Sequence, residues 1–284
     1  MKPPYALLAL LAITPPAMAQ SLNFGGNAGS PPAPIQITAS QGVEWSQKTD
    51  TVTATGNAKA VRGDVTVTAD QLIAHYAPQK STTSSSSADT SSSLGQGSTQ
   101  LTELDAVGHV HIYTATDNAW SDRAVYSASQ QVLVLTGKDL KLTTPKEVVT
   151  ARDSIEYYTG EHKAIARGLA HVTSADGRSI SADVITAYFS TQPGSNGAES
   201  LEKVDALGNV TITTPADTAS GSSGVYMPKT GEARLGGDVH ITHKGNHLTG
   251  ADALVDTKTG TATLLAAPGG RVSGVILPST EKTK

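Results

Sequence analysis

The sequence contains no cysteine, which excludes disulfides, thiolate chemistry and cysteine-based zinc sites. Aromatic residues make up only 4% of the 284 residues, while glycines number 27. This composition favours many thin strands and turns over thick helices. Lys and Arg number 21 against 25 Asp and Glu. The slightly acidic balance argues against nucleic acid as the main partner, because neutralising phosphates needs clustered cations.

The N-terminus has the pattern of an export signal. Lys2 precedes a short apolar run, Tyr5 to Ile13, which is too short to span a bilayer, and Ala17-Met18-Ala19 follows. We therefore expect a signal peptide over residues 1–19, cleaved after Ala19, and an exported mature chain. Residues 20–33 are rich in Gly, Ser, Pro and Asn and predict a flexible lead.

The stretch Gly56–Tyr76 is the unit from which the chain is built. It predicts two short strands of alternating apolar and polar residues, broken at the turn Gly63-Asp64. Similar glycines, each followed by an alternating apolar pair, recur at Gly108, Gly137, Gly168, Gly208 and Gly237. An Asp, or in one unit a Ser, follows the glycine of each unit, at Asp70, Asp122, Asp153, Asp183, Ser223 and Asp252. Recurrence of this kind predicts a stack of repeated strands.

Two polar insertions interrupt the repeat. Residues 79–100 are so rich in Ser and Thr that they cannot bury enough area to offset ordering, which predicts a disordered loop. Residues 190–200 are a smaller insertion at the equivalent place. The same repeat runs on both sides of the first insertion, which favours a single repeat region over residues 34–278 and a polar tail over 279–284. A domain boundary at the first insertion is the alternative.

The recurring acids and histidines are candidate metal ligands. Calcium repeats place several acids in one short loop, whereas each unit here offers one, so a turn-closing Asp that accepts backbone N–H groups is favoured. His111, His171 and His240 share a register, each three residues after a glycine and next to apolar neighbours. Alternation turns them outward and predicts a solvated polar column. A metal site is the alternative.

No catalytic residue and no cofactor is expected. The sequence contains no Gly-rich phosphate loop before a helix, no G-x-S-x-G and no H-E-x-x-H. A parallel β-helix enzyme that cuts polysaccharide is the enzymatic alternative, but it needs clustered carboxylates, and here they are spread along the chain.

Alternation also defines an inward row of mostly small and medium aliphatic side chains. Two facing sheets lined in this way either interdigitate into a closed core or leave an apolar slot. The expected inward residues are Ile35, Ile37, Leu72, Ala74, Val110, Ile112, Tyr126, Ala128, Val172, Ile185, Val210 and Val239.

Several short motifs resemble the LptA/OstA family of periplasmic lipopolysaccharide-transport proteins. They are Pro34-Ile35-Gln36-Ile37, Thr55-Gly56-Asn57, Ala69-Asp70, Leu135-Thr136-Gly137 and the C-terminal stretch 271–279. The resemblance implies an all-β fold, a twisted, V-shaped antiparallel β-jelly roll (OstA-like) whose interior holds lipid A acyl chains. It implies a non-enzymatic periplasmic bridge that passes lipopolysaccharide from inner to outer membrane. The Ser-rich insertion and one or two extra repeat units depart from the family pattern.

The resemblance also implies binding residues and partners. Family lipid contacts fall on Ile35 and Tyr126, with Ala128 two residues on, and near Ile112. With Ile37 and Leu72 of the inward row, these are the expected lipid-binding residues. The implied partners are lipopolysaccharide, an LptC-like protein at the inner membrane and an LptD-like protein at the outer membrane.

Unpaired edges predict how subunits join. Residues expected on the first strand are Ile35, Gln36, Ile37 and Thr38, and on the last strand Val272, Val275 and Leu277. Their unpaired N–H and C=O groups favour a head-to-tail homo-oligomer. The remaining alternative is a structural or adhesive β-solenoid of the cell envelope, with a filled interior and no lipid.

Overall fold

The structure is a computed structural model that describes residues 35–78, 99–190, 200–243, 245–259 and 261–275. Within these ranges every regular element is a strand, and the eighteen strands form one sheet in which all pairs are antiparallel. The predicted all-β antiparallel fold is confirmed. The strands are β1 (Gln36–Thr38), β2 (Gly42–Ser46), β3 (Thr51–Arg62), β4 (Val65–Pro78), β5 (Thr99–Tyr113), β6 (Asn118–Ser127), β7 (Val132–Thr136), β8 (Leu140–Thr143), β9 (Glu147–Ala151), β10 (Ser154–Tyr158), β11 (Lys163–Ser174), β12 (Ser179–Phe189), β13 (Leu201–Thr213), β14 (Asp217–Met227), β15 (Glu232–His243), β16 (Asn246–Asp256), β17 (Thr261–Leu265) and β18 (Ser273–Val275).

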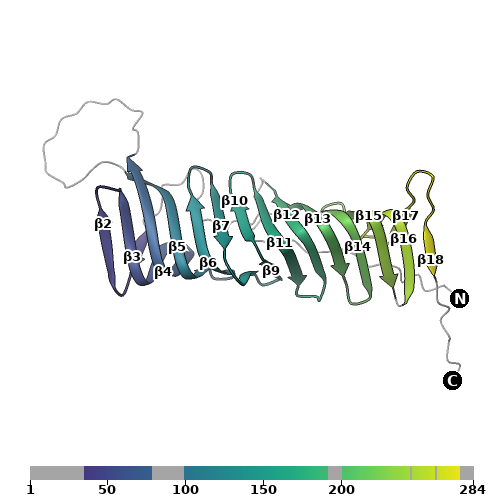
Figure 1. Ribbon diagram of the computed structural model, residues 1–284, viewed down its shortest axis with the longest axis horizontal. Coiled ribbons are helices and arrows are strands. Elements are labelled where there is room, and N and C mark those ends of the chain that lie inside the picture. Colours follow the sequence, from purple (N-terminus) through teal and green to yellow (C-terminus); the bar gives the residue numbers. More distant parts are fainter. Residues whose placement is uncertain (1–34, 79–98, 191–199, 244, 260, 276–284) are drawn as a thin grey trace, which may run out of the picture.

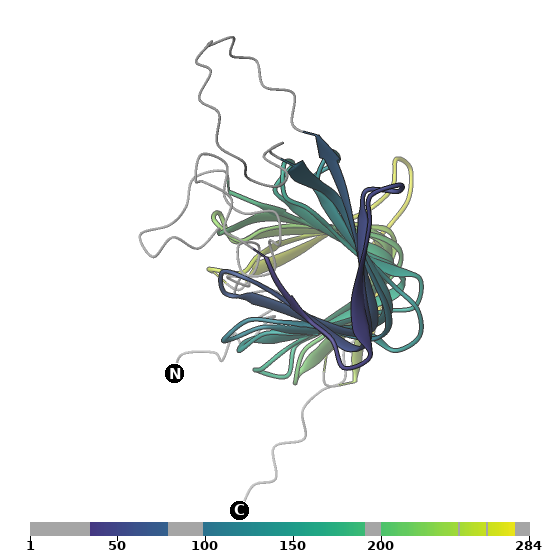
Figure 2. The ribbon, with the colours of Figure 1, turned by 90° about the vertical axis from the view of Figure 1, so that its left-hand side faces the viewer.

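The sheet is long and folded over on itself. Figure 1 shows the strands side by side along the long axis, from β2 at one end to β18 at the other. Viewed down that axis, the strands curve around a shared interior and form two facing walls (Figure 2). Apolar side chains from both walls meet inside, and all twelve residues of the predicted inward row lie in this core or pack against it.

Five of the repeated glycines lie inside long strands rather than at the start of one: Gly56, Gly108, Gly168, Gly208 and Gly237. Gly137 lies between β7 and β8. At Gly108 in β5 the register with β6 shifts between Val107 and Val110. Gly108 has φ +78° and His109 φ +46°, a left-handed pair that forms a bulge. The bulge bends the strand, so its two alternating halves line opposite walls of one interior. Similar register shifts occur in β3, β11, β13 and β15.

A polar side chain from the preceding strand covers each bulge glycine. Asp70, Asp122, Asp153 and Asp183 lie against Gly108, Gly137, Gly168 and Gly208, so each acid contacts the glycine of the next unit rather than its own.

The sequence predicted that these acids accept hydrogen bonds from backbone N–H groups, and in the described part of the chain one of the four does so. Asp122 accepts one from the Lys138 N–H at 2.8 Å, whereas Asp70 is hydrogen bonded to the His109 ring at 2.8 Å. At Gly237 the covering residue is Ser222, not the expected Ser223, because the bulge places Ser222 outside the paired register.

Several boundaries differ from expectation or lie outside the described residues. β4 runs to Pro78 and β5 starts at Thr99, two residues inside the expected insertion. The predicted signal peptide, the lead, the polar tail, Leu277 and most of both insertions lie outside the described residues. Among the described residues, no helix is long enough and apolar enough to cross a membrane.

The sheet contains two copies of one strand arrangement, β1–β8 and β9–β15, and β16–β18 extend the second copy. The broken first strand of each copy makes matching bonds: the Ser40 N–H donates to the Gly56 carbonyl and the Arg152 N–H to the Gly168 carbonyl, both at 2.7 Å. Further along, equivalent residues stand a hundred positions apart, including Gly108 and Gly208, Val110 and Val210, Asp117 and Asp217, and Tyr126 and Tyr226.

The two copies join without a gap in the sheet. β7 pairs with β10, with Leu135 opposite Ile155, and β8 pairs with β9, with Leu140 opposite Ala151. On each side of this junction the sheet position is occupied by two short strands, β7 with β8 and β9 with β10. Most neighbouring positions are occupied by a single strand of ten or more residues. The junction therefore interrupts the regular stacking in the middle of the molecule.

Candidate functional site

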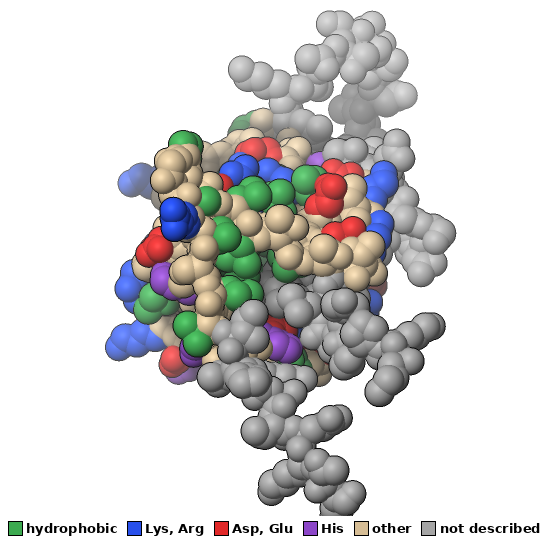
Figure 3. Space-filling view, turned by 90° about the vertical axis from the view of Figure 1, so that its right-hand side faces the viewer, with side chains coloured by type: hydrophobic (Ala, Val, Ile, Leu, Met, Phe, Trp, Pro, Cys, Tyr) green, Lys and Arg blue, Asp and Glu red, His purple; other side chains and the backbone are tan. Residues whose placement is uncertain are grey.

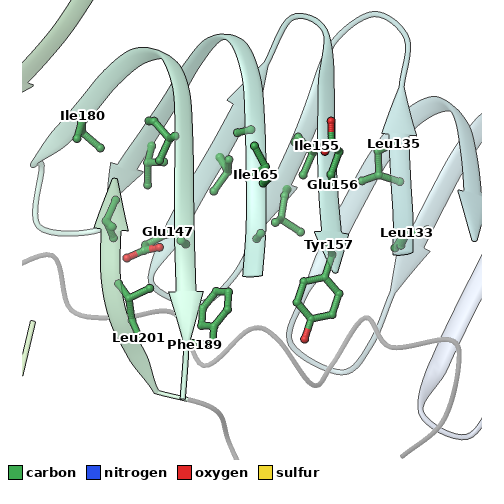
Figure 4. A pocket seen from close by; sticks show the side chains of 18 residues that line it. Leu133, Leu135, Glu147, Ile155, Glu156, Tyr157, Ile165, Ile180, Phe189 and Leu201 are labelled. Carbon is green, nitrogen blue, oxygen red and sulfur yellow. The ribbon is translucent and has the colours of Figure 1, made fainter. Parts of the chain in front are cut away.

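Midway along the molecule the two walls leave an unfilled slot. It contains about 980 Å³ of space free of protein atoms, counting its solvent-open side. Strands β7 to β13 supply its walls, and Figure 4 shows the side chains that line it. The lining residues are Leu133, Leu135, Leu142, Glu147, Val149, Ile155, Glu156, Tyr157, Ala164, Ile165, Ala166, Val172, Ile180, Ile185, Ala187, Phe189, Leu201 and Val204.

The slot opens at the junction between the two copies. β7 and β8 come from the first copy and the remaining strands from the second. Small side chains, Ala164, Ala166 and Ala187, stand on its walls where larger ones would fill the gap. With two exceptions, Glu147 and Glu156, the lining is aliphatic or aromatic, which suits a hydrocarbon ligand.

Smaller voids flank the slot on both sides. One of about 270 Å³ is lined by residues that include Ile112 and Tyr126, and one of about 390 Å³ by residues that include Ile212 and Tyr226. The equivalent tyrosines of the two copies thus occupy equivalent places. The interior is therefore apolar on both sides of the junction.

The six residues predicted to bind lipid all face the interior, but none lines the large slot. Ile112 and Tyr126 line the smaller void, and Leu72 is 1% exposed in the core. Ile35, Ile37 and Ala128 are half-buried and pack against the core. Of the wider inward row, Val172 and Ile185 do line the large slot. Sequence reasoning missed the rest of the β7–β13 lining, because alternation shows which way a side chain faces and not how far apart the walls stand.

Glu147 is the one carboxyl of the slot without a hydrogen-bonding partner among the described residues. It opens β9 and is 4% exposed. Its backbone N–H donates to Thr144 Oγ1 at 3.0 Å, and its carbonyl accepts the Thr144 N–H at 2.9 Å. Its Oε1 is buried and makes no hydrogen bond within that part of the chain. Burial raises the pKa of Glu147 to about 7, against the opposing effect of Lys146 and with a smaller contribution from Asp176.

Glu156 is fully engaged, in contrast. It accepts hydrogen bonds from Ser154 Oγ at 2.7 Å, Tyr158 Oη at 2.9 Å and Arg167 Nε at 2.9 Å. Burial alone would raise its pKa, but these hydrogen bonds and the Arg167 charge lower it. Glu156 is therefore an ionised structural group, and Glu147 Oε1 is the slot atom left without a hydrogen-bond partner among the described residues.

The three histidines occupy one polar row on the outer face. His111 stands opposite Trp120, His171 opposite Ser181 and His240 opposite Thr249, and the predicted outward register is confirmed. Three strands, β6, β8 and β9, lie between the strands of the first two, so these histidines are four strand spacings, or about 19 Å, apart. Among the described residues, no group of three or more His, Asp or Glu could hold a metal ion.

The two ends of the sheet expose apolar groups and unpaired strands. Within the described chain, β1 and β2 pair only with β3, and β18 pairs only with β16. Val43 and Trp45 of β2, on the interior side, are 53% and 71% exposed. At the opposite end hydrophobic side chains gather near the centre of the face, bordered by charged ones (Figure 3).

A folded-over antiparallel sheet around an apolar interior is the architecture of a β-jelly roll with a binding slot. The chain belongs to the LptA/(LptD N-terminal domain) family of LPS transport proteins: the family's sequence profile matches residues 36–163 and again residues 153–261. The expected family is thereby confirmed. The double match agrees with the two structural copies.

Among solved structures, the chain is similar to LptH of Pseudomonas aeruginosa, the LptA homologous periplasmic component of the lipopolysaccharide transport device. The sequences are 22% identical, the match covers 46% of this chain and 95% of LptH, and the TM-score is 0.38. Comparison with curated proteins found no match.

Proposed function

We propose that this transport protein binds lipid A acyl chains of lipopolysaccharide in the apolar slot and passes the lipid across the periplasm, from the inner to the outer membrane. The observation that carries the proposal is the slot itself: about 980 Å³ of space counting its solvent-open side, of which about 110 Å³ is cavity volume, with an almost wholly apolar lining. A purely structural rod would gain stability by filling that space.

Energetics favour such a carrier. Burying a methylene group is worth about 0.8 kcal/mol, so a twelve-carbon chain costs on the order of 10 kcal/mol to expose to water. Lipid A carries several such chains, and a continuous apolar interior removes most of this cost. The protein performs no chemistry in this role, and the driving energy comes from a partner.

The ends of the sheet support docking of neighbours of the same fold. At the junction Ile155 is 6% exposed because β7 lies against its strand. Val43 is the equivalent residue of the first copy, and it is 53% exposed on an edge strand. A sheet edge from an LptC-like or LptD-like protein, or from another molecule of this protein, would cover Val43 and Trp45. Within the chain, β7 covers Ile155 in the same way.

The proposed route requires export. The leader Tyr5–Ile13 with Ala17-Met18-Ala19 supports a periplasmic location. Mature protein recovered from the periplasm should begin at Gln20.

Site-specific photocrosslinking tests lipid binding. A photoreactive residue at Leu201 or Phe189, in the slot, should crosslink to lipopolysaccharide, whereas one at Trp120 on the outer face should not. Ile155→Asp should reduce capture at least tenfold while the β circular-dichroism signal persists. Equal crosslinking inside and outside, or no capture at any interior position, would reject the proposal in favour of the structural β-solenoid.

A further inference from the structure

The slot contains a polar group that its own fold leaves unused. Glu147 Oε1 is buried with no hydrogen-bond partner among the described residues, and the side chain lines the slot between apolar neighbours (Figure 4). A buried polar group without a partner is destabilising. An apolar residue of similar size at this position would avoid that cost.

The turn that precedes β9 does not require the carboxyl. In that turn Thr144 bonds to the backbone of Glu147, and in two further turns Thr114 and Thr214 bond to the backbones of Asp117 and Asp217 in the same way. Asp217 is hydrogen bonded to His243 inside the protein. Glu147 has no such internal partner in the described chain, so its partner is to be sought in the ligand.

We propose that Glu147 is the hydrogen-bonding partner of a hydroxyl group carried on the hydrocarbon chain of the ligand, so that the slot prefers hydroxylated acyl chains over plain ones. The inference rests on the proposed function, because it assigns a ligand feature to the same slot.

A neutral hydroxyl fits this place better than a cation. Burial keeps the Glu147 carboxyl partly protonated near neutral pH, so it can both donate and accept a hydrogen bond. An ammonium group would have to leave water for an apolar slot, at a far larger cost than a hydroxyl. The charged groups that act on the pKa of Glu147 are Lys146 on its own turn, which lowers it, and Asp176 on the β11–β12 turn, which raises it. Asp176 is itself ion-paired with Arg178.

Displacement of an apolar fluorescent dye by neutral chains tests this inference. The probes are methyl esters of tetradecanoic acid, either plain or with a hydroxyl at carbon 3 or at carbon 12. The wild-type protein should bind at least one hydroxylated ester about tenfold more tightly than the plain ester, the value of one added hydrogen bond to a buried group.

Two variants and a control locate the effect. Glu147→Leu should abolish the preference while retaining plain-ester binding, and Glu147→Gln should keep a preference because its amide can still donate and accept. Glu161→Leu, which removes an exposed carboxylate, should behave as wild type. Equal binding of all esters to wild type, or a preference that survives in Glu147→Leu, would overturn the role of Glu147 alone. If no ester displaces the dye and lipopolysaccharide is not crosslinked, the proposed function fails with it.

Discussion

Asp70 of β4 lies directly against Gly108 of β5, at the point where β5 bends from one wall to the other. A Cβ at position 108 would overlap the Asp70 carboxylate, and the backbone there has φ +78°. The acid and the glycine therefore fit together as a pair, and the repeat of this pair along the sheet bends successive strands in register.

Gly108→Ala should destabilise the protein by about 2–4 kcal/mol, because it adds left-handed strain to a collision with Asp70. Urea unfolding followed by circular dichroism would measure the loss. Gly63→Ala is the matched control: φ is +58° at a turn with no atom within 4 Å, so only the strain of about 1 kcal/mol applies. Adding Asp70→Ala to Gly108→Ala should restore part of the stability. Equal losses at the two glycines would contradict this account.

The stability of the protein should fall as pH rises past the ordinary pKa of Glu147. Burial raises this pKa from 4.5 to about 7. Below the lower value the carboxyl is protonated in both states, and between the two values only the unfolded chain releases the proton. The group therefore lowers the free energy of unfolding by about 3 kcal/mol across that window, at about 1.4 kcal/mol per pH unit.

Comparison with Glu147→Gln isolates this contribution from other titrating groups. Urea unfolding at about pH 5 and about pH 8 should show a loss for wild type that is about 2–3 kcal/mol larger than for the variant. Parallel behaviour of the two proteins would show that the Glu147 carboxyl is hydrated in the folded state.

The buried pair of Asp217 and His243 should be strongly coupled. Their side chains are 3% and 14% exposed, so His243→Ala leaves a buried carboxyl group without its hydrogen-bonding partner and should cost about 3 kcal/mol. The double variant Asp217→Ala with His243→Ala should recover part of that loss in a double-mutant cycle. The exposed pair of His109 and Asp70 offers a comparison in which His109→Ala should change stability little. Additive effects at the buried pair would argue against coupling.

Self-association should depend on the interior-facing side of the first edge. Trp45→Asp places a charge where a docking sheet would bury an apolar group, and it should raise the dissociation constant of head-to-tail oligomers at least tenfold in sedimentation experiments. Ser46→Asp, on the same strand but the opposite face, should have little effect. Loss of association in both variants alike would point to a general charge effect.

Local patterns predicted the fold well. Leu72 and Val110 could be assigned to the interior because side chains alternate strictly along a strand. The family followed from motifs such as Thr55-Gly56-Asn57, which are contiguous in sequence. Gly56 itself was misplaced at a strand start, because a left-handed bulge inside a strand has the same local sequence as a turn before one.

The slot could not be found in the same way. Its width at Leu133 and Leu201 depends on the separation of two walls that are far apart in sequence. Glu147 did leave a signal: Thr144 precedes it by three residues, as Thr214 precedes Asp217. That recurrence would have marked an inward acid, although only the structure reveals that its partner is missing.

The pairing of β8 with β9 has a consequence for how the proposed lipid path through the interior is kept continuous. In a chain of separate subunits each contact dissociates on dilution, whereas here the two copies are tethered by residues 144–146 and meet at a high effective concentration. This central link therefore persists however scarce the protein becomes in the cell, whereas the proposed contacts at the outer edges would respond to its abundance.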